Sequence, residues 1–240
     1  MSQQTAVVVG AGPGLGWSIA LRFAQAGMRT IIAARDPGKL QALIAQSDDA
    51  IAPRARFEAH ACDATVREDV TALFSRFEQD RVAPAVVVFN AGAFVPAGIL
   101  DITPEEFERC WRIGCFGGFL VGQAAARLMT TRGEGTIIFT GATASLRGSA
   151  GFANLAVPKF GLRALAQSMA RELGPRNVHV AHVVIDGQIR SERYRALAQE
   201  RGPDALLAPE AIAEAYYQLH LQPRSAWTHE LDLRPWTEKF

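Results

Sequence analysis

Residues 5–16 read TAVVVGAGPGLG, an apolar run of strand length that enters a glycine-rich loop and then a helical segment. The apolar run predicts a buried strand over 5–9, and the pattern that follows predicts a helix over 15–26. A loop in this position favours phosphate, because the N–H groups and the dipole at a helix N-terminus attract anions. The stretch therefore predicts the first unit of a dinucleotide-binding parallel sheet.

The glycines of this loop have separate expected tasks. Gly10 allows a sharp turn off the strand, Gly14 lets the backbone approach a pyrophosphate, and Gly16 lets the helix pack tightly on the sheet. The spacing is GxxxGxG, since the commoner GxGxxG pattern would place its third glycine at Leu15. Gly12 and Leu15 complete the expected phosphate loop. The alternative is a glycine-rich turn that binds no ligand.

The rest of the chain alternates strand-length apolar runs with helix-length amphipathic segments. Further strands are predicted at 30–34, 56–61, 85–89, 136–140, 178–185 and 227–233, and further helices at 39–46, 67–79, 104–129, 155–173 and 209–219. The run 86–88 is apolar throughout, as expected for a parallel strand covered on both faces. This regular alternation predicts an α/β fold, a doubly wound, Rossmann-like parallel sheet of about seven strands in one domain over 1–240.

Composition narrows the class of protein. Lys and Arg number 25 and Asp and Glu 24, giving a net charge of +1, and hydrophobic residues make up 49%. The apolar content excludes a disordered chain, and the balanced charge argues against a nucleic-acid partner. No apolar run is long enough to cross a membrane, and the start does not resemble a secretory signal, so no membrane association is expected.

The three cysteines, Cys62, Cys110 and Cys115, form an odd and sparse set. Such a set favours a reducing compartment and predicts a cytoplasmic protein. His60 and Cys62 lie two apart on one strand face, but two ligands fall short of a metal site, so no metal is expected.

The end of the second strand bears on cofactor choice. A cofactor with a free ribose 2′-OH requires a carboxylate at this strand end, and Ala34 stands there instead. Arg35 follows, and a guanidinium suits a 2′-phosphate. Asp36 comes one residue later and is an alternative ribose acceptor, while a solvated surface charge is the alternative for Arg35. We predict NADP as the preferred cofactor and NAD as the alternative.

Further motifs resemble the short-chain dehydrogenase/reductase family over nearly the whole chain. Asp63 and Ala64 resemble the adenine contact after the third strand, and Asn90-Ala91-Gly92 matches the family's NAG motif. Lys159 is placed like the active-site Lys, and Gly187 and Ile189 resemble the turn that contacts the nicotinamide in this family. The resemblance implies these cofactor-binding residues: Gly10, Gly12, Gly14, Leu15, Gly16, Arg35, Asp63, Ala64, Asn90, Ala91, Gly92, Lys159, Gly187 and Ile189.

The catalytic positions depart from the family's pattern. Leu155 stands four residues before Lys159, where the family has the Tyr that moves a proton. The family's Ser aligns with Ala142 and its Asn with Gly114, and Pro158 directly precedes the Lys. Only Lys159 is retained of the four positions. The pattern is similar to a divergent subgroup that lacks the active-site Tyr but keeps the Lys.

Four residues are candidates for the missing groups: Thr143, Asn154, Asp186 and Tyr194. Thr143 can polarise an oxygen but is a poor acid. Tyr194 lies in an Arg-rich stretch, about 186–208, which in this family forms a lid over the substrate. The plain alternatives are a turn residue for Asp186 and a loop aromatic for Tyr194.

Helix packing gives a further expectation for the site. We expect Phe160, Leu162 and Leu165 to pack on the sheet and hold Lys159 beside the nicotinamide ribose. Leu155, one turn earlier, is then expected to project toward the same cleft.

The resemblance implies an NAD(P)-dependent oxidoreductase with an atypical, impaired site, acting on a small carbonyl or alcohol substrate. The alternative is a catalytically inactive NADP-binding sensor or partner subunit. A third function, as a lyase, hydratase or isomerase, has no acid–base pair in its support. Relatives pair the helices at 104–129 and 155–173 with their twofold mates, so a homodimer or homotetramer is expected.

Overall fold

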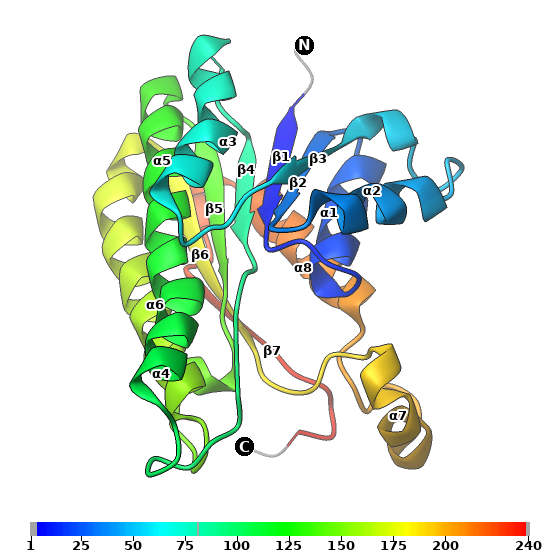
Figure 1. Ribbon diagram of the computed structural model, residues 1–240. Helices are drawn as coiled ribbons and strands as arrows, with labels where there is room; N and C mark the ends of the chain where they lie inside the picture. Colours follow the sequence, from blue (N-terminus) through cyan, green and yellow to red (C-terminus); the bar gives the residue numbers. More distant parts are fainter. Residues whose placement is uncertain (1–3, 81, 239–240) are drawn as a thin grey trace.

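The computed structural model describes residues 4–80 and 82–238 and confirms the predicted α/β fold (Figure 1). Its core is a seven-stranded sheet in the order β3-β2-β1-β4-β5-β6-β7. Every neighbouring pair of strands is parallel. The strands are β1 (Thr5–Val9), β2 (Arg29–Ala34), β3 (Phe57–Ala61), β4 (Val86–Phe89), β5 (Gly135–Thr140), β6 (Val178–Ile185) and β7 (Glu230–Leu233).

The helices follow the predicted segments, with one addition inside the Arg-rich stretch. They are α1 (Leu15–Gln25), α2 (Pro37–Gln46), α3 (Arg67–Gln79), α4 (Pro104–Trp111), α5 (Gly117–Arg132), α6 (Ala153–Leu173), α7 (Arg195–Arg201) and α8 (Pro209–Leu221). Helix α7 has seven residues and buries none of them, so it lacks the amphipathic pattern that identifies a helix in sequence. Among the residues described, no helix has the length and apolar character that crossing a bilayer requires.

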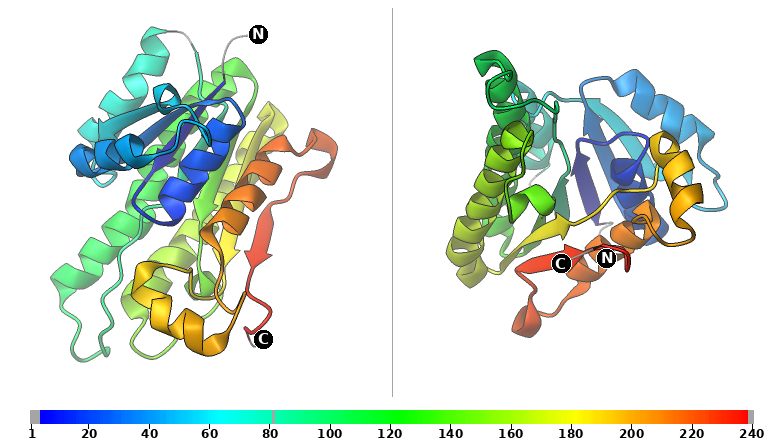
Figure 2. Two further views of the ribbon diagram at one scale, coloured as in Figure 1. Left: turned by 90° about the vertical axis from the view of Figure 1, so that its right-hand side faces the viewer. Right: turned by 90° about the horizontal axis from the view of Figure 1, so that it is seen from below.

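Helices cover both faces of the sheet, as Figure 2 shows. Along β1, Ala6 and Val8 join the apolar cluster under α1 and α8, while Val7 and Val9 join the cluster under α3, α5 and α6. All four side chains are buried, because successive strand residues point to opposite faces and each face is covered. Two-sided burial explains why the strand is apolar without alternation.

The prediction of one helix over 104–129 is wrong at its centre. A π-helical turn, η2 (Arg112–Phe116), separates α4 from α5. Gly114 lies in this turn, and a Cβ added there would come 3.0 Å from the Cβ of Pro158 on α6. Single π turns of this kind often mark functional sites.

One packing expectation needs correction. Phe160 is 42% exposed, whereas Leu162 is fully buried and Leu165 partly buried, so Phe160 does not pack on the sheet. At Gly16, a Cβ would come within 2.9 Å of Ala11 Cα and Gly10 O, just after β1, and 3.2 Å from Asn90 Nδ2, just after β4. Leu162 therefore provides the main anchor of the helix surface near Lys159.

The sheet has its switch point between β1 and β4. The chain leaves β1 toward β2 and β3, then returns to place β4 on the other side of β1. Loops that leave neighbouring strands in opposite directions open a crevice at the carboxyl ends, where ligands bind in such folds. Helix α7 lies below these strand ends in Figure 1.

Candidate active site

The glycine-rich loop has the geometry that phosphate binding needs. Gly10 has a φ of 85°, and a Cβ on it would overlap the backbone of Ala91. Its N–H donates to the carbonyl of Ala33 at 2.9 Å, which fixes the loop to β2. Gly14 N-caps α1, and no side chain bonds the cap. Apart from the adjoining residues, nothing lies within 4 Å of a Cβ built on Gly12 or Gly14, so this backbone has open space beside it for an anion.

A cavity of about 260 Å³ lies where the loops after β1, β2, β3 and β4 meet. It brings Arg35 together with Asp63 and Ala64, and with the Asn90-Ala91-Gly92 loop. Asn90 Nδ2 donates to the Gly10 carbonyl at 3.1 Å and so ties the two loops together. The cavity therefore gathers the residues that the sequence predicted for the adenine side of a dinucleotide.

Some residues that line this cavity were not predicted from the sequence, two of them outside any motif. Arg109 and Ile113 line it from α4 and η2. They follow no motif, and only the return of the chain after β4 brings them beside Arg35. A long-range packing contact of this kind leaves no signal in a single sequence.

A second cavity, about 870 Å³, lies at the carboxyl ends of β5 and β6. It gathers residues for which the sequence predicted separate tasks: phosphate binding, catalysis, nicotinamide contact and a lid. These residues are Gly14, Leu15, Ala142, Thr143, Leu155, Gly187, Ile189 and Tyr194. Its volume is that of a small-molecule site. Arg147, Arg201, Phe94 and Phe152 also line it and carried no motif signal.

Lys159 is only 6% exposed. Such burial is unusual, because a lysine amine with an ordinary pKa carries a positive charge at neutral pH. Its Nζ donates to the Thr140 carbonyl at 2.6 Å and lies 3.7 Å from the place of a Cβ on Gly92. Burial lowers the pKa of this amine to about 8. Leu155 lines the large cavity, whereas the Lys159 amine bonds the carbonyl at the end of β5 and lies beside Gly92.

Gly114 and Pro158 form one packing unit. The Pro158 ring lies against Gly114, with 3.0 Å between its Cβ and a Cβ built on the glycine. An Asn side chain at Gly114 would need the volume that this ring fills. The two departures from the family's pattern are therefore coupled.

The four candidate substitutes divide into two pairs. Thr143 and Tyr194 line the large cavity. Asp186 is buried outside it, where it accepts a 2.5 Å bond from the Thr143 hydroxyl and lies 3.3 Å from an Arg234 nitrogen. Asn154 is also buried, and its Nδ2 donates to the Val95 carbonyl at 2.8 Å, which holds the loop after β4.

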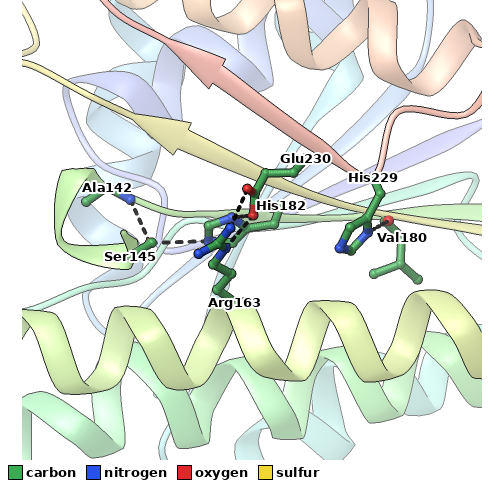
Figure 3. A network of polar contacts seen from close by, with 7 residues as sticks. All are labelled: Ala142, Ser145, Arg163, Val180, His182, His229 and Glu230. Atoms are coloured by element: carbon green, nitrogen blue, oxygen red, sulfur yellow. Dashed lines mark hydrogen bonds and ion pairs between the residues drawn. The ribbon is translucent and has the colours of Figure 1, made fainter. Parts of the chain in front are cut away.

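A buried polar network supports the turn that carries Ala142 (Figure 3). The Ala142 N–H donates to Ser145 Oγ at 3.1 Å, and this oxygen lies 3.3 Å from His182 Nε2. His182 Nδ1 lies 3.5 Å from a Glu230 oxygen, and Arg163 binds both Glu230 oxygens at 2.6 and 2.7 Å. Ser145 is fully buried, so this Ser–His–Glu arrangement positions the turn rather than reaching a substrate.

The described part of the chain contains no candidate metal-binding cluster. No cluster of three or more His, Cys, Asp or Glu side chains there could hold a metal ion. His60 instead lies beside Glu58 and Arg76, and Cys62 is a buried free thiol.

Comparison with known proteins agrees with these motifs. Residues 4–201 match the family model described as short chain dehydrogenase. The chain is 32% identical over 203 residues to the 3-oxoacyl-(acyl-carrier-protein) reductase MabA of Mycobacterium bovis. The match covers 85% of this chain and 76% of that protein.

Solved structures of similar fold match nearly the whole chain. A short-chain dehydrogenase from Rhodopseudomonas palustris is 42% identical, with a TM-score of 0.82, and the match covers 97% of this chain and 99% of the other. A metagenomic short-chain oxidoreductase, solved in complex with NADP, is 28% identical with a TM-score of 0.82 over 98% of each chain.

The buried histidine network predicts a pH dependence of stability. Burial lowers the pKa of His182 to about 4, whereas a histidine in the unfolded chain titrates near ~6.5. The unfolded chain thus binds more protons between these values, and stability falls as pH drops from about 6.5 toward 4. His182→Gln should remove about one proton of this uptake, and the slope of the unfolding free energy should fall by up to ~1.4 kcal/mol per pH unit.

Urea unfolding at several pH values between 7 and 4.5 measures this slope. His179 and His220 shift in the same direction through burial, so the variant is compared with the parent chain. His60→Gln is the control for loss of a half-buried histidine on β3. An unchanged slope in His182→Gln would contradict the proposed burial of a neutral imidazole.

Proposed function

The chain belongs to the short-chain dehydrogenase/reductase family, and from this premise we propose that it uses NADP(H) to interconvert a small carbonyl compound and its alcohol. One observation carries the proposal. The 870 Å³ cavity joins the phosphate loop, through Gly14 and Leu15, to the nicotinamide turn at Gly187 and Ile189. The same cavity is lined by the catalytic positions Ala142 and Leu155. Cofactor and substrate would meet there.

The preference for NADP over NAD has local support. Arg35 lines the adenine-side cavity and Ala34 supplies no carboxylate. Asp36, the alternative ribose acceptor, caps α2 instead, accepting from the N–H groups of Gly38 and Lys39 at 3.1 and 3.3 Å. Asp63 Oδ1 accepts from the N–H and hydroxyl of Thr65 at 2.9 and 2.8 Å. Both nearby carboxylates thus have local partners, which leaves the guanidinium to select a 2′-phosphate.

The chain's own residues set the chemistry around the cofactor. Bound NADPH would supply the hydride. The glycine loop would hold the pyrophosphate, and Lys159, beneath Gly92, would lie near the nicotinamide ribose. Leu155 has no proton to transfer, and Ala142 has no hydroxyl to polarise the carbonyl oxygen. Loss of a general acid costs typically ~10²–10⁴-fold in rate, so we propose an impaired site in a divergent subgroup that lacks the Tyr.

Tyr194 is our candidate for residual proton transfer. It lines the cavity from η5 (Glu192–Tyr194), within the lid proposed for 186–208. Two backbone hydrogen bonds join the two ends of this lid. The Arg190 N–H donates to Leu207 O at 2.8 Å, and the Leu207 N–H donates to Gln188 O at 2.9 Å. Thr143 is less suited, because its hydroxyl proton is committed to Asp186.

A catalytically inactive NADP-binding sensor or partner subunit is the second candidate. It is favoured by the apolar pair Ala142 and Leu155 and by the bond of the Lys159 amine to Thr140. Such a protein would bind NADPH but turn over no carbonyl.

We also propose a homodimer or homotetramer that pairs α4, α5 and α6 with their mates. The stacked rings of Trp111, Phe116 and Phe119 lie on α4, the π-helical turn η2 and α5, and Trp111 and Phe119 are more than one-third exposed. A cytoplasmic location remains our prediction, and the three free cysteines accord with it.

Cofactor selection is tested at Arg35. Arg35→Asp should weaken NADPH binding by about tenfold or more, because a charge-assisted contact to phosphate contributes ~1.5–3 kcal/mol. NADH binding should change far less. Titration of both cofactors by protein fluorescence measures the two affinities, and Arg54→Asp is a control for loss of an exposed arginine. Equal losses for both cofactors would show that Arg35 is not the selector.

Catalysis is tested by restoring the two missing groups. The parent chain should turn over generic carbonyls at least ~10²-fold below a typical ~10 s⁻¹. The double variant Ala142→Ser with Leu155→Tyr should raise this rate by ~10-fold or more, because it returns a proton donor and a polarising hydroxyl. Nicotinamide absorbance against a panel of carbonyls measures the rate.

The matched control is Ala142→Ser with Leu155→Phe, which adds the ring without its hydroxyl. Tyr194→Phe in the parent chain should remove the residual rate. An ordinary rate in the parent chain would refute the impaired site, and NADPH binding without any turnover would support the sensor.

A further inference from the structure

Positive charge is concentrated around the large cavity. Arginine side chains line it at four positions, Arg147, Arg190, Arg193 and Arg201, against a single carboxylate, Glu238. The whole chain has a net charge of only +1. The excess is therefore a property of this site and not of the surface in general.

Two of these arginines have partners within the protein. Arg190 forms an ion pair with Glu210 at 2.7 Å, and the Arg193 guanidinium lies 5.5 Å from the centre of the Tyr194 ring. Among residues 4–80 and 82–238, no carboxylate lies within ion-pair distance of Arg147 or Arg201. Neither guanidinium group has an ion-pair partner there, so both can bind a ligand.

Arg147 and Arg201 come from different walls of the cavity. Arg147 follows η3 (Thr143–Ser145), on the turn after β5, whereas Arg201 ends α7 in the lid. A guanidinium presents a planar set of donors that matches carboxylate and phosphate oxygens, often through two bonds at once. Two such groups on one cavity, one from the turn after β5 and one from α7, suit an anionic group.

Apolar side chains form a large part of the remaining lining. Phe94 and Phe152 stack with 4.6 Å between ring centres, and Leu155 lies on the same cavity. A ligand that satisfies both parts has an apolar body and an anionic end.

From this arrangement we propose that the substrate is a carbonyl compound that carries a carboxylate or phosphate, bound through Arg147 and Arg201. The proposal rests on the proposed function and names its substrate class. In the reduction, hydride from NADPH bonds to the carbonyl carbon, the carbonyl oxygen takes a proton, and NADP⁺ and the alcohol are the products. The anionic group does not react, and its role is to bind and orient.

The test compares matched pairs of probes on the NADP-loaded chain. Benzoylformate is compared with its neutral methyl ester, and dihydroxyacetone phosphate with dihydroxyacetone. Binding is measured by calorimetry, which needs no turnover, and NADPH oxidation is measured separately. At least one anion should bind about tenfold tighter than its neutral partner, as loss of a charge-assisted contact implies. The pair that shows the preference tells carboxylate from phosphate.

Arg147→Ala and Arg201→Ala should each reduce this preference several-fold and leave NADPH affinity unchanged. Arg195→Ala is the control, because Arg195 lies on the same lid helix, pairs with Glu192 and faces a different pocket. The preference should also weaken with added salt, since exposed charges are screened.

Equal binding of anionic and neutral probes, or a preference that survives both substitutions, would overturn the proposal. A parallel loss of NADPH affinity in both variants would overturn it too, by assigning the arginines to the cofactor. Anion-selective binding without NADPH oxidation would uphold the anionic site while refuting the proposed oxidoreductase.

Discussion

The site depends on close contact between two backbone segments. Gly10 follows β1 with a φ of 85°, and the backbone of Ala91, which follows β4, occupies the space that a side chain would need. Asn90 then bonds the Gly10 carbonyl at 3.1 Å. Because β1 and β4 flank the switch point of the sheet, this contact joins the two halves of the fold at the crevice. The phosphate loop and both cavities are arranged around it.

The fold was readable from sequence because its signals are local. The apolar run Val86–Phe89 and the loop after Val9 identify strands and a turn without reference to the rest of the chain. The site was only partly readable. That Asp36 caps α2 follows from neighbouring residues, but the bond between Thr143 and Asp186 joins residues far apart in sequence. The lining by Arg147 and Arg201 likewise depends on tertiary packing, which periodicity does not record.

The two halves of the proposed site differ in how far they keep the family's pattern. The cofactor half retains open glycines, an uncapped helix start and an exposed guanidinium. The chemical half has apolar side chains at Ala142 and Leu155, and Pro158 fills the space beside Gly114. Apolar side chains at these positions pack stably, but Leu155 leaves the cavity without a proton donor at this position of α6. Stability and cofactor binding are thus compatible with the weak chemistry that we propose, in which residual proton transfer falls to Tyr194.

A crystal structure with NADPH bound tests this account most directly. We expect the pyrophosphate on the backbone of the Gly12–Leu15 loop, the 2′-phosphate on Arg35, and the nicotinamide in the large cavity against Gly187 and Leu155. Within that cavity, the C4 face of the nicotinamide should meet no protein hydroxyl on α6. A nicotinamide placed outside this cavity, or a polar side chain of α6 in contact with its C4 face, would contradict the account.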